Sequence, residues 1–351
     1  MLTQMVKRRS RRLAAVALAA FLGCAYGVGA ASAQNAVSAE EWNKVIQEAK
    51  REGKVVLWSS KSESLMERIL EAFKRKYPGI QTSFLRIQGP PAATRINEEL
   101  AANRKLTADV IINVENVWLA GHAEKGNLQP LAGPAAAGYP RAAIKNGAPI
   151  LGYDPILIMY NTDQIKTPPA DWDTLLDDKY RGRVGIVSDT LTVFKIHWAF
   201  LEKKMGLDYL KKLGTLAPVI ANSATSTTQA IAAGELLWAP YAQSYLVEDL
   251  KRQGAPVDYA LPKSGTHAIV QYGASFKQAA NPNAGRLLLD FLMTREGQAI
   301  INGGNGGVSP FNDIPGTLTY DMSKIEILDA SKYSAEDLAA ASRMFNSTFR
   351  R

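Results

Sequence analysis

The chain has 351 residues, with 41 Lys and Arg against 33 Asp and Glu, a formal net charge of +8 and a single cysteine. Five of the basic residues and Cys24 lie before residue 34, so the rest of the chain carries only +3. This slight excess, without a run of basic and aromatic residues, argues against nucleic-acid binding. A chain without cysteine from residue 34 onward also excludes disulfides and zinc–thiolate sites there.

Residues 1–33 have the pattern of an export signal. A basic head precedes an apolar run over 13–30, and residues 31–33 give the small-x-small pattern of a signal peptidase site. We therefore expect a cleaved signal peptide and a periplasmic protein. The arginine pair in residues 10–13 leaves twin-arginine export open beside the general secretory route, and a lipid anchor at Cys24 is the less favoured alternative.

Helical and strand patterns alternate after residue 34. A capping box at Ser38–Glu41 opens a helix that Gly53 ends, and an apolar strand follows over 54–59. The alternation continues with a helix from 62, a strand over 80–87, a helix over 92–103 and a buried strand over 108–112. This order predicts a doubly wound α/β lobe whose ligand edge lies at the carboxyl ends of the strands.

The rest of the chain repeats this style. Strands are expected over 149–161, 183–187 and 268–273, and helices from 190 to 204, over 207–213, 281–292 and 334–349. The turn over 303–307 is glycine-rich, but no Lys-Ser or Lys-Thr follows it, so it is expected to be a mobile turn rather than a phosphate loop. About 318 residues after the signal are enough for two lobes of ordinary domain size.

The segment 220–245 indicates half of a ligand cleft. A hydroxyl-rich turn opens a short helix, a Gly-Glu pair closes it, and an apolar strand then leads to tyrosines. Free backbone N–H groups at a helix start attract anions. Phenol oxygens at a strand end can hold a hard cation or cover an organic ligand.

An ordered series of phrases resembles the periplasmic solute-binding proteins of ferric-iron-type ABC importers, which have the type II periplasmic binding protein fold. The phrases are 55–60, 108–115 with 126–131, 158–162, 171–175, 179–184 and 294–298. The resemblance implies two doubly wound α/β lobes joined by two crossing hinge strands, with the ligand between them. Lobe 1 would be 34–157 completed by about 268–315, and lobe 2 would be 158–267 completed by about 316–351.

The resemblance also places candidate ligand contacts on both lobes. Those on lobe 1 are Ser60, Lys61, Ser62 and Glu115, and those on lobe 2 are Ser188, Thr190, Asn222, Ser223, Tyr241 and Tyr245. Ferric-binding members carry two adjacent tyrosines about ten residues beyond the Gly-Glu pair. Tyr245 matches the second, whereas Ser244 replaces the first, and Tyr241 substitutes only if its segment is not a straight strand.

The charges of the candidate contacts indicate the class of ligand. Fe(III) prefers several anionic oxygens, and Glu115 and Tyr245 would supply two of them. Asp189 would repel a synergistic anion unless it is turned away or paired. We therefore expect a small organic or phosphorylated anion, with ferric iron bound by Glu115 and Tyr245 as the alternative. No resident cofactor is expected, and Fe(III) would be transported cargo.

Structural roles compete with these interpretations. Tyr153, Tyr160 and Trp238 are typical packing residues, and Ser188 and Ser223 are equally typical helix caps. Lys61 could be a solvated side chain, Glu115 could pair with an arginine or a backbone N–H, and no two of His122, His197 and His267 have metal-ligand spacing.

The sequence lacks a Gly-x-Ser-x-Gly motif, a Walker loop and a paired His-Asp near a serine, so we expect no enzyme. The predicted role is that of a monomer that delivers its solute to an inner-membrane ABC permease. A ligand-sensing subunit for a membrane receptor kinase is the remaining alternative.

Overall fold

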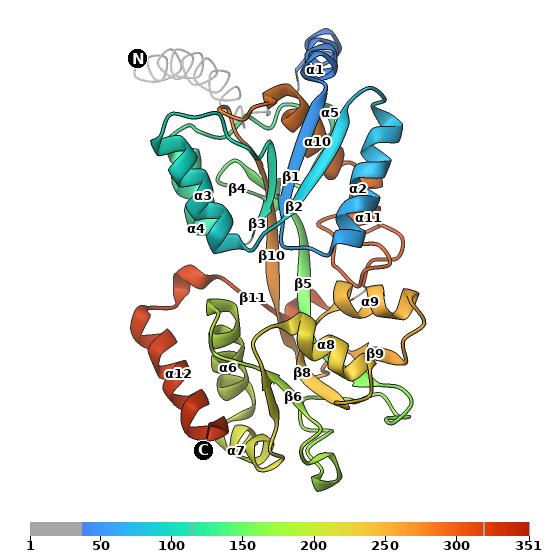
Figure 1. Cartoon of the computed structure of the whole chain (residues 1–351), viewed down its shortest axis with the longest axis vertical. Helices are drawn as coiled ribbons and strands as arrows, with labels where there is room; N and C mark the ends of the chain where they lie inside the picture. The colour runs from blue at the N-terminus through green and yellow to red at the C-terminus, as the bar shows by residue number, and fades with distance from the viewer. Residues whose placement is uncertain (1–36, 114, 319, 351) are drawn as a thin grey trace, which may run out of the picture. The chain divides into compact units, whose positions relative to one another are not determined.

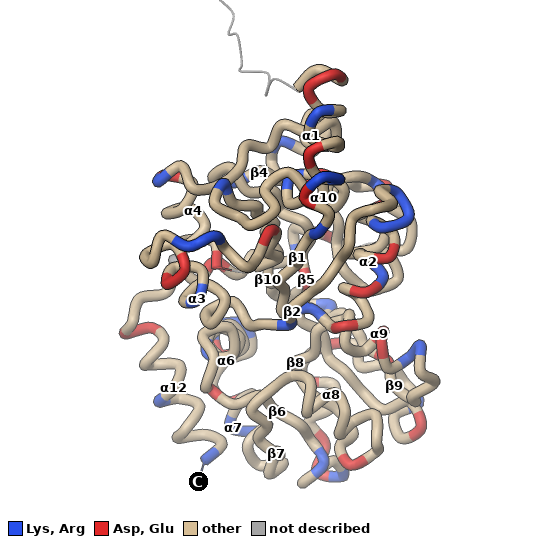
Figure 2. The backbone as a smooth tube through the Cα atoms, turned by 45° about the horizontal axis from the view of Figure 1, so that its top comes forward, with Lys and Arg blue, Asp and Glu red and all other residues tan. Residues whose placement is uncertain are grey.

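The computed structural model describes residues 37–113, 115–318 and 320–350. The expected signal peptide over 1–33, with Cys24, lies outside the described residues. Within them, no helix has the length and apolar character needed to cross a membrane. In Figure 2 basic and acidic residues are interspersed along the tube instead of gathering on one element.

One hydrophobic core surrounds a parallel sheet in the order β2-β1-β3, and the elements that pack there are called the first lobe. Its first helix begins at the Ser38–Glu41 capping box and ends at Gly53, whose φ of 68° is the left-handed value that favours glycine. Its strands are β1 (Lys54–Ser59), β2 (Gln81–Arg86), β3 (Val110–Asn113) and β4 (Ile144–Lys145). Its helices are α1 (Ala39–Glu52), α2 (Glu63–Lys76), α3 (Gly89–Ala101), α4 (Asn116–Glu124), α5 (Pro134–Gly138), α10 (Pro282–Met293) and α11 (Arg295–Ile301).

Two further hydrophobic clusters, both of which include residues of β8, form the second lobe. Its strands are β6 (Gly185–Val187), β7 (Val219–Ala221), β8 (Trp238–Gln243), β9 (Val257–Ala260) and β11 (Ile325–Ile327). Its helices are α6 (Thr192–Met205), α7 (Leu207–Thr215), α8 (Ala224–Ala232), α9 (Ser244–Arg252) and α12 (Ala335–Phe349). Short 3-10 turns occupy 141–143, 178–180, 322–324 and 330–332.

Two long strands, β5 (Ala148–Asn161) and β10 (Thr266–Ser275), run through both lobes as an antiparallel pair (Figure 1). β5 contributes Ile150 and Leu151 to the first core but Ile156 and Ile158 to the second. The expected α/β architecture with two crossing strands is therefore confirmed. The residue boundaries expected for the two lobes stay predictions.

The expectation that an apolar strand carries the tyrosines holds for Tyr241, which lies in β8, but not for Tyr245. The strand ends at Gln243, and α9 begins at Ser244, so Tyr245 lies in the first turn of a helix. The turn over 303–307, expected to be mobile, contains a buried Asn305 whose Nδ2 donates to the carbonyl oxygens of Ile300, Ile301 and Gly303.

The first core contains a buried carboxyl whose titration should be visible in stability. Asp290 accepts hydrogen bonds from the backbone N–H groups of Ala135 at 3.0 Å and Ala136 at 3.3 Å, and burial raises its pKa to about 6. Because the folded pKa lies above the unfolded one, the native state holds this proton more tightly. The associated stability is complete below about pH 4 and is lost as the pH rises through 6.

We predict that Asp290→Asn, which cannot ionise, becomes more stable than the wild type as the pH rises. The difference in the free energy of unfolding should be small at pH 4 and grow to at most about 3 kcal/mol at pH 7.5. Urea unfolding at both pH values measures it. A difference that does not change with pH would contradict the raised pKa.

Candidate functional site

In the first lobe, three parallel strands end at one edge of the sheet. Ser59 at the end of β1 lies opposite Arg86 at the end of β2 and Ile112 near the end of β3. The segments that follow these strands therefore meet at this edge. They carry Ser60, Lys61, Ser62, Gln88 and Glu115.

Lys61 does not point into solvent. Its Nζ lies 2.7 Å and 2.5 Å from the two carboxylate oxygens of Asp154 on β5, and both side chains are 3% exposed. Gln271 on β10 donates to the same carboxylate at 2.8 Å. The Lys61 ammonium also lies 4.5 Å from the centre of the Tyr245 ring. Lys61 thus links the first lobe to both crossing strands and to the second lobe.

Tyr245 is held as a neutral phenol. Burial, followed by the nearby carboxylate of Asp154, raises its pKa above the usual tyrosine range, and the positive charge of Arg86 opposes this only in part. Its hydroxyl donates to Oε1 of Gln243 at 3.0 Å. The contact of Tyr245 with Lys61 and the charge effect of Arg86 bring this side chain close to the strand ends of the first lobe.

Glu115 lies at the same edge but not within the Lys61 cluster. Among the described residues it has no ion pair or side-chain hydrogen bond, and burial raises the pKa of its carboxyl. It packs so closely on the start of α3 that a Cβ on Gly89 would lie 3.0 Å from Glu115 Oε1. The suggested pairing of Glu115 with an arginine is therefore absent from the described part of the chain.

In the second lobe, β6 and β7 are parallel and also end together. Val187 lies opposite Ala221, and Ser188 N–H donates to the Ala221 carbonyl at 2.8 Å. The turns that carry Ser188, Thr190, Asn222 and Ser223 are consequently neighbours at the starts of α6 and α8.

The hydroxyls of these turns are partly used within the turns themselves. Ser188 and Thr190 share a hydrogen bond of 2.9 Å, and Ser223 caps α8 by accepting from the Ser226 N–H at 3.1 Å. The start of α6 has no side-chain cap. This leaves α6 the more open of the two helix starts to an anion.

Asp189, which was expected to repel a bound anion, has a cationic partner. Arg350, which follows α12, lies 3.2 Å from one oxygen of Asp189, and Asn346 lies 3.5 Å from the other. The Asp189 carboxylate is therefore turned toward α12, and Arg350 balances its charge. An anion at the Ser188–Thr190 turn would meet no free carboxylate there.

Burial, followed by the nearby Tyr245 and Asp154, raises the pKa of Tyr241, so this buried side chain lies beside the Lys61 cluster. The register of β8 against β5 shifts at Pro240 and Tyr241, and the Tyr241 ring, 1% exposed, packs edge-on against Phe194 at 5.2 Å and His197 at 4.9 Å. Tyr160 and Trp238 likewise lie in the hydrophobic cores, and His197 hydrogen-bonds His267 at 2.9 Å.

The structure also reveals site residues that sequence reasoning missed. Asp154, Gln271 and Arg86 surround Lys61 and Tyr245, yet none lies in a motif. A signal existed only for Asp154, since it is a single charged residue within a long apolar strand. Such a residue usually has a buried partner, but the sequence does not identify which one.

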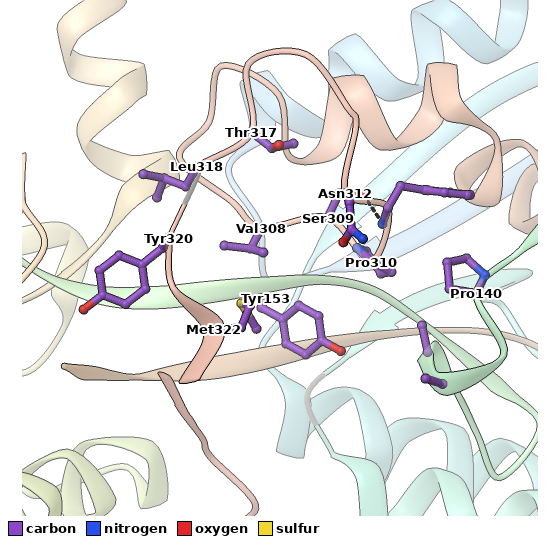
Figure 3. Close-up of a pocket in the computed structure, with 13 residues that line it drawn as sticks. Pro140, Tyr153, Val308, Ser309, Pro310, Asn312, Thr317, Leu318, Tyr320 and Met322 are labelled. Carbon is purple, nitrogen blue, oxygen red and sulfur yellow. Dashed lines mark hydrogen bonds between the residues drawn. The ribbon is translucent and has the colours of Figure 1, made fainter. Parts of the chain in front are cut away.

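A separate pocket of about 390 Å³ lies beside β5 (Figure 3). It is lined by Pro140, Ala142, Ala143, Tyr153, Val308, Ser309, Pro310, Phe311, Asn312, Thr317, Leu318, Tyr320 and Met322. None of the candidate ligand contacts is among them. Because neighbouring residues of a strand point to opposite faces, Tyr153 faces this pocket while Asp154 faces Lys61.

The described residues contain no group of three or more His, Cys, Asp or Glu that could hold a metal ion. The two residues predicted to bind iron, Glu115 and Tyr245, also have different surroundings. Glu115 lies against the start of α3, whereas Tyr245 lies under the Lys61 ammonium.

Comparison with known proteins places this geometry in a family. Residues 68–316 match the family model described as bacterial extracellular solute-binding protein. The fold is similar to the substrate-binding protein of an ABC transporter from Agrobacterium tumefaciens, at a TM-score of 0.72 and 19% identity over 85% of this chain and 94% of that one.

Two further solved structures are similar. Iron-bound HitA from Pseudomonas aeruginosa has a TM-score of 0.61 and 22% identity over 85% of this chain and 98% of its own. AfuA from Actinobacillus pleuropneumoniae, with fructose-6-phosphate bound, has a TM-score of 0.63 and 20% identity over 85% of this chain and 99% of its own.

We predict that Lys61→Met destabilises the protein, because it leaves the Asp154 carboxylate buried without its cation. The free energy of unfolding should fall by about 3–5 kcal/mol. Lys61→Met combined with Asp154→Asn should recover most of this loss, because no buried charge remains. Urea unfolding of the three proteins tests the pair, and a double variant as unstable as the single one would contradict it.

Proposed function

The chain belongs to the bacterial extracellular solute-binding proteins, and we propose that its cleft captures a small organic or phosphorylated anion. In this proposal the two lobes close on the ligand, and the protein passes it to the inner-membrane permease of an ABC importer. The protein would act in the periplasm as a monomer after removal of residues 1–33. The family is a transport component and not typically enzymatic.

The observation that carries the anion proposal is the unpaired charge of Arg86. This guanidinium lies at the carboxyl end of β2, close enough to Tyr245 to affect its pKa, and no described carboxylate forms an ion pair with it. Lys61 pairs with Asp154 and Asp189 pairs with Arg350, whereas the half-buried Glu115 has no described ion pair, and burial raises its pKa and so disfavours its charged form. Arg86 is exposed, so its guanidinium is the charge at this edge that an anionic ligand can reach.

The second lobe supports the same ligand class. The neighbouring starts of α6 and α8 present hydroxyls and backbone N–H groups from Ser188, Thr190 and Ser223. Donors of this kind suit carboxylate and phosphate oxygens. A ligand held between Arg86 and these helix starts would contact both lobes and so favour their closed arrangement.

Iron and a phosphorylated sugar both occur among proteins of this fold, so the fold does not decide between them. The surroundings of Tyr245 favour the anion. Fe(III) needs ionised oxygen ligands. Here burial raises the pKa of both Tyr245 and Glu115, which favours the neutral form of each side chain over the ionised form that iron needs.

We predict that Arg86→Gln weakens anion binding by roughly 10- to 100-fold, the range expected when one charge-assisted hydrogen bond is lost. A thermal-shift panel of small carboxylates and phosphorylated sugars, with neutral sugars for comparison, would identify ligands, and calorimetry would measure the affinities. Native mass spectrometry of the protein as purified would show any ligand it retains.

The matched control is Arg104→Gln, which removes an exposed arginine located before the amino end of β3. It should leave the affinity unchanged. Failure of every anion in the panel, or equal losses in both variants, would contradict the proposal.

We also predict that ferric citrate produces no phenolate-to-iron charge-transfer band in the visible spectrum. The reason is that Tyr245 is a buried neutral phenol beside an ammonium group. A visible band that appears in the wild type and disappears in Tyr245→Phe would establish iron as the ligand instead.

A further inference from the structure

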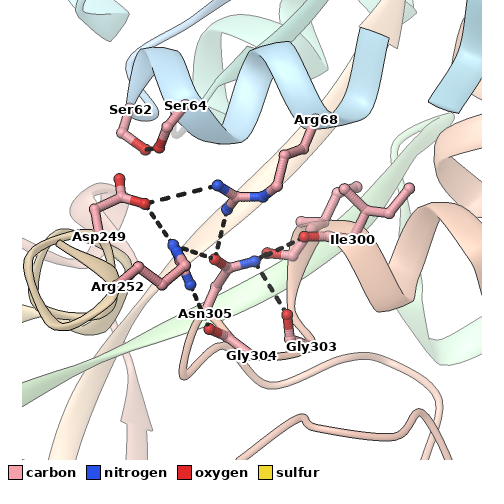
Figure 4. Close-up of polar contacts among 10 residues, drawn as sticks. Ser62, Ser64, Arg68, Asp249, Arg252, Ile300, Gly303, Gly304 and Asn305 are labelled. Atoms are coloured by element: carbon pink, nitrogen blue, oxygen red, sulfur yellow. Dashed lines mark hydrogen bonds and ion pairs between the residues drawn. The ribbon is translucent and has the colours of Figure 1, made fainter. Parts of the chain in front are cut away.

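The two lobes touch through a group of polar side chains from α2, α9 and the turn after α11 (Figure 4). From the first lobe come Arg68 on α2 and Asn305 in the turn after α11. From the second lobe come Asp249 and Arg252, both on α9. We call these four residues the clasp.

The clasp is a closed network. Arg68 Nη2 donates to Asn305 Oδ1 at 2.8 Å, and Arg252 Nη2 donates to the same oxygen at 3.2 Å. Asp249 pairs with Arg252 and lies 3.8 Å from Arg68 Nη1. Arg252 Nη1 also donates to the carbonyl of Gly304 at 3.0 Å. Each arginine therefore contacts both an acceptor of its own lobe and one of the other lobe.

The acceptor on the first lobe, Asn305 Oδ1, is held in place by contacts within its own lobe. Asn305 is 3% exposed, and its amide nitrogen is used by the carbonyls of the turn, so its oxygen must face the two guanidinium groups. The turn itself lies directly against α9. A Cβ on Gly306, whose φ is +65°, would lie 2.4 Å from Ser244 Cβ. Only glycine permits this approach without displacement.

The carboxylate on the second lobe is charged at neutral pH. Burial alone would raise the pKa of Asp249, but hydrogen bonds from Ser62, Arg252 and Ser64 outweigh it and lower the pKa. Two of these donors, Ser62 and Ser64, belong to the first lobe. Asp249 is 14% exposed, so its ion pairs are less screened by solvent than ordinary surface pairs.

The register of α9 couples the clasp to the cleft. Tyr245, Asp249 and Arg252 are spaced at i, i+4 and i+7, so they lie on one face of the helix. Tyr245 contacts Lys61, and the other two contact Arg68 and Asn305. A movement that separates Tyr245 from the first lobe must also break the clasp.

We propose that Arg68, Asp249, Arg252 and Asn305 hold the two lobes together in the absence of ligand. The clasp shifts the ligand-free equilibrium toward the closed arrangement, so less of the ligand's binding energy is needed for closure. This inference goes beyond the proposed ligand, because the clasp acts whatever solute the cleft takes.

The test measures the distance between the lobes without any ligand. Spin labels at Glu98→Cys on α3 and Gln229→Cys on α8, both exposed positions, report the separation by pulsed electron resonance. A Cys24→Ser change leaves only the introduced thiols. The wild type should show mainly the short-distance population. Arg68→Met with Arg252→Met should raise the ratio of open to closed protein by roughly tenfold or more, the effect of losing charge-assisted contacts.

The matched control is Arg343→Met, which breaks an exposed ion pair with Glu336 inside α12 and should leave the distances unchanged. Asp249→Arg, which puts three cations together, should open the lobes, and adding Arg68→Glu to it should close them again. Such recovery would separate a specific contact from damage to the fold. High salt should open the wild type but not the Arg68→Met, Arg252→Met protein.

An unchanged distance distribution in the Arg68→Met, Arg252→Met protein would overturn the proposal. So would an Asp249→Arg protein that Arg68→Glu fails to close. Because no ligand is present in these measurements, failure of the anion proposal would not affect them.

Discussion

The antiparallel pairing of β5 with β10 is the constraint on which the rest of the structure depends. These two strands supply both hydrophobic cores and are buried along nearly all their length, so neither can leave one lobe without disturbing the other. They also carry Asp154 and Gln271, which hold the Lys61 ammonium. The strands therefore fix both the connection of the lobes and the position of the buried Lys61–Asp154 pair.

A buried ion pair at this point has consequences for ligand choice. The Lys61–Asp154 pair is balanced, and its desolvation is offset by close geometry and the added amide of Gln271. Lys61 thus contributes a fixed cation beside Tyr245 but little net charge. In the proposed function, the exposed Arg86 guanidinium then has the larger influence on which solute is attracted.

Helix α9 carries both a candidate ligand contact and the residues that hold the two lobes together. Its first turn carries Tyr245, and its next two turns carry Asp249 and Arg252 toward the first lobe. Because α9 is a single helix, its contact with Lys61 and its contacts with Arg68 and Asn305 form and break together when the second lobe moves. Gly306 of the 303–307 turn allows α9 to approach this closely, which gives that turn a packing role.

The sequence by itself determined the local elements and the edge at which the candidate site lies. The Ser38–Glu41 capping box, Gly53 and the alternation of apolar segments depend only on neighbours in the chain, and they predicted the helices and strands of the first lobe. Only the tertiary structure decided the partners of the side chains. Lys61 meets Asp154, 93 residues away, and Tyr241, at a register shift of β8, packs against Phe194 and His197 in the second lobe. Such partners follow from how the lobes pack, and no local spacing encodes them.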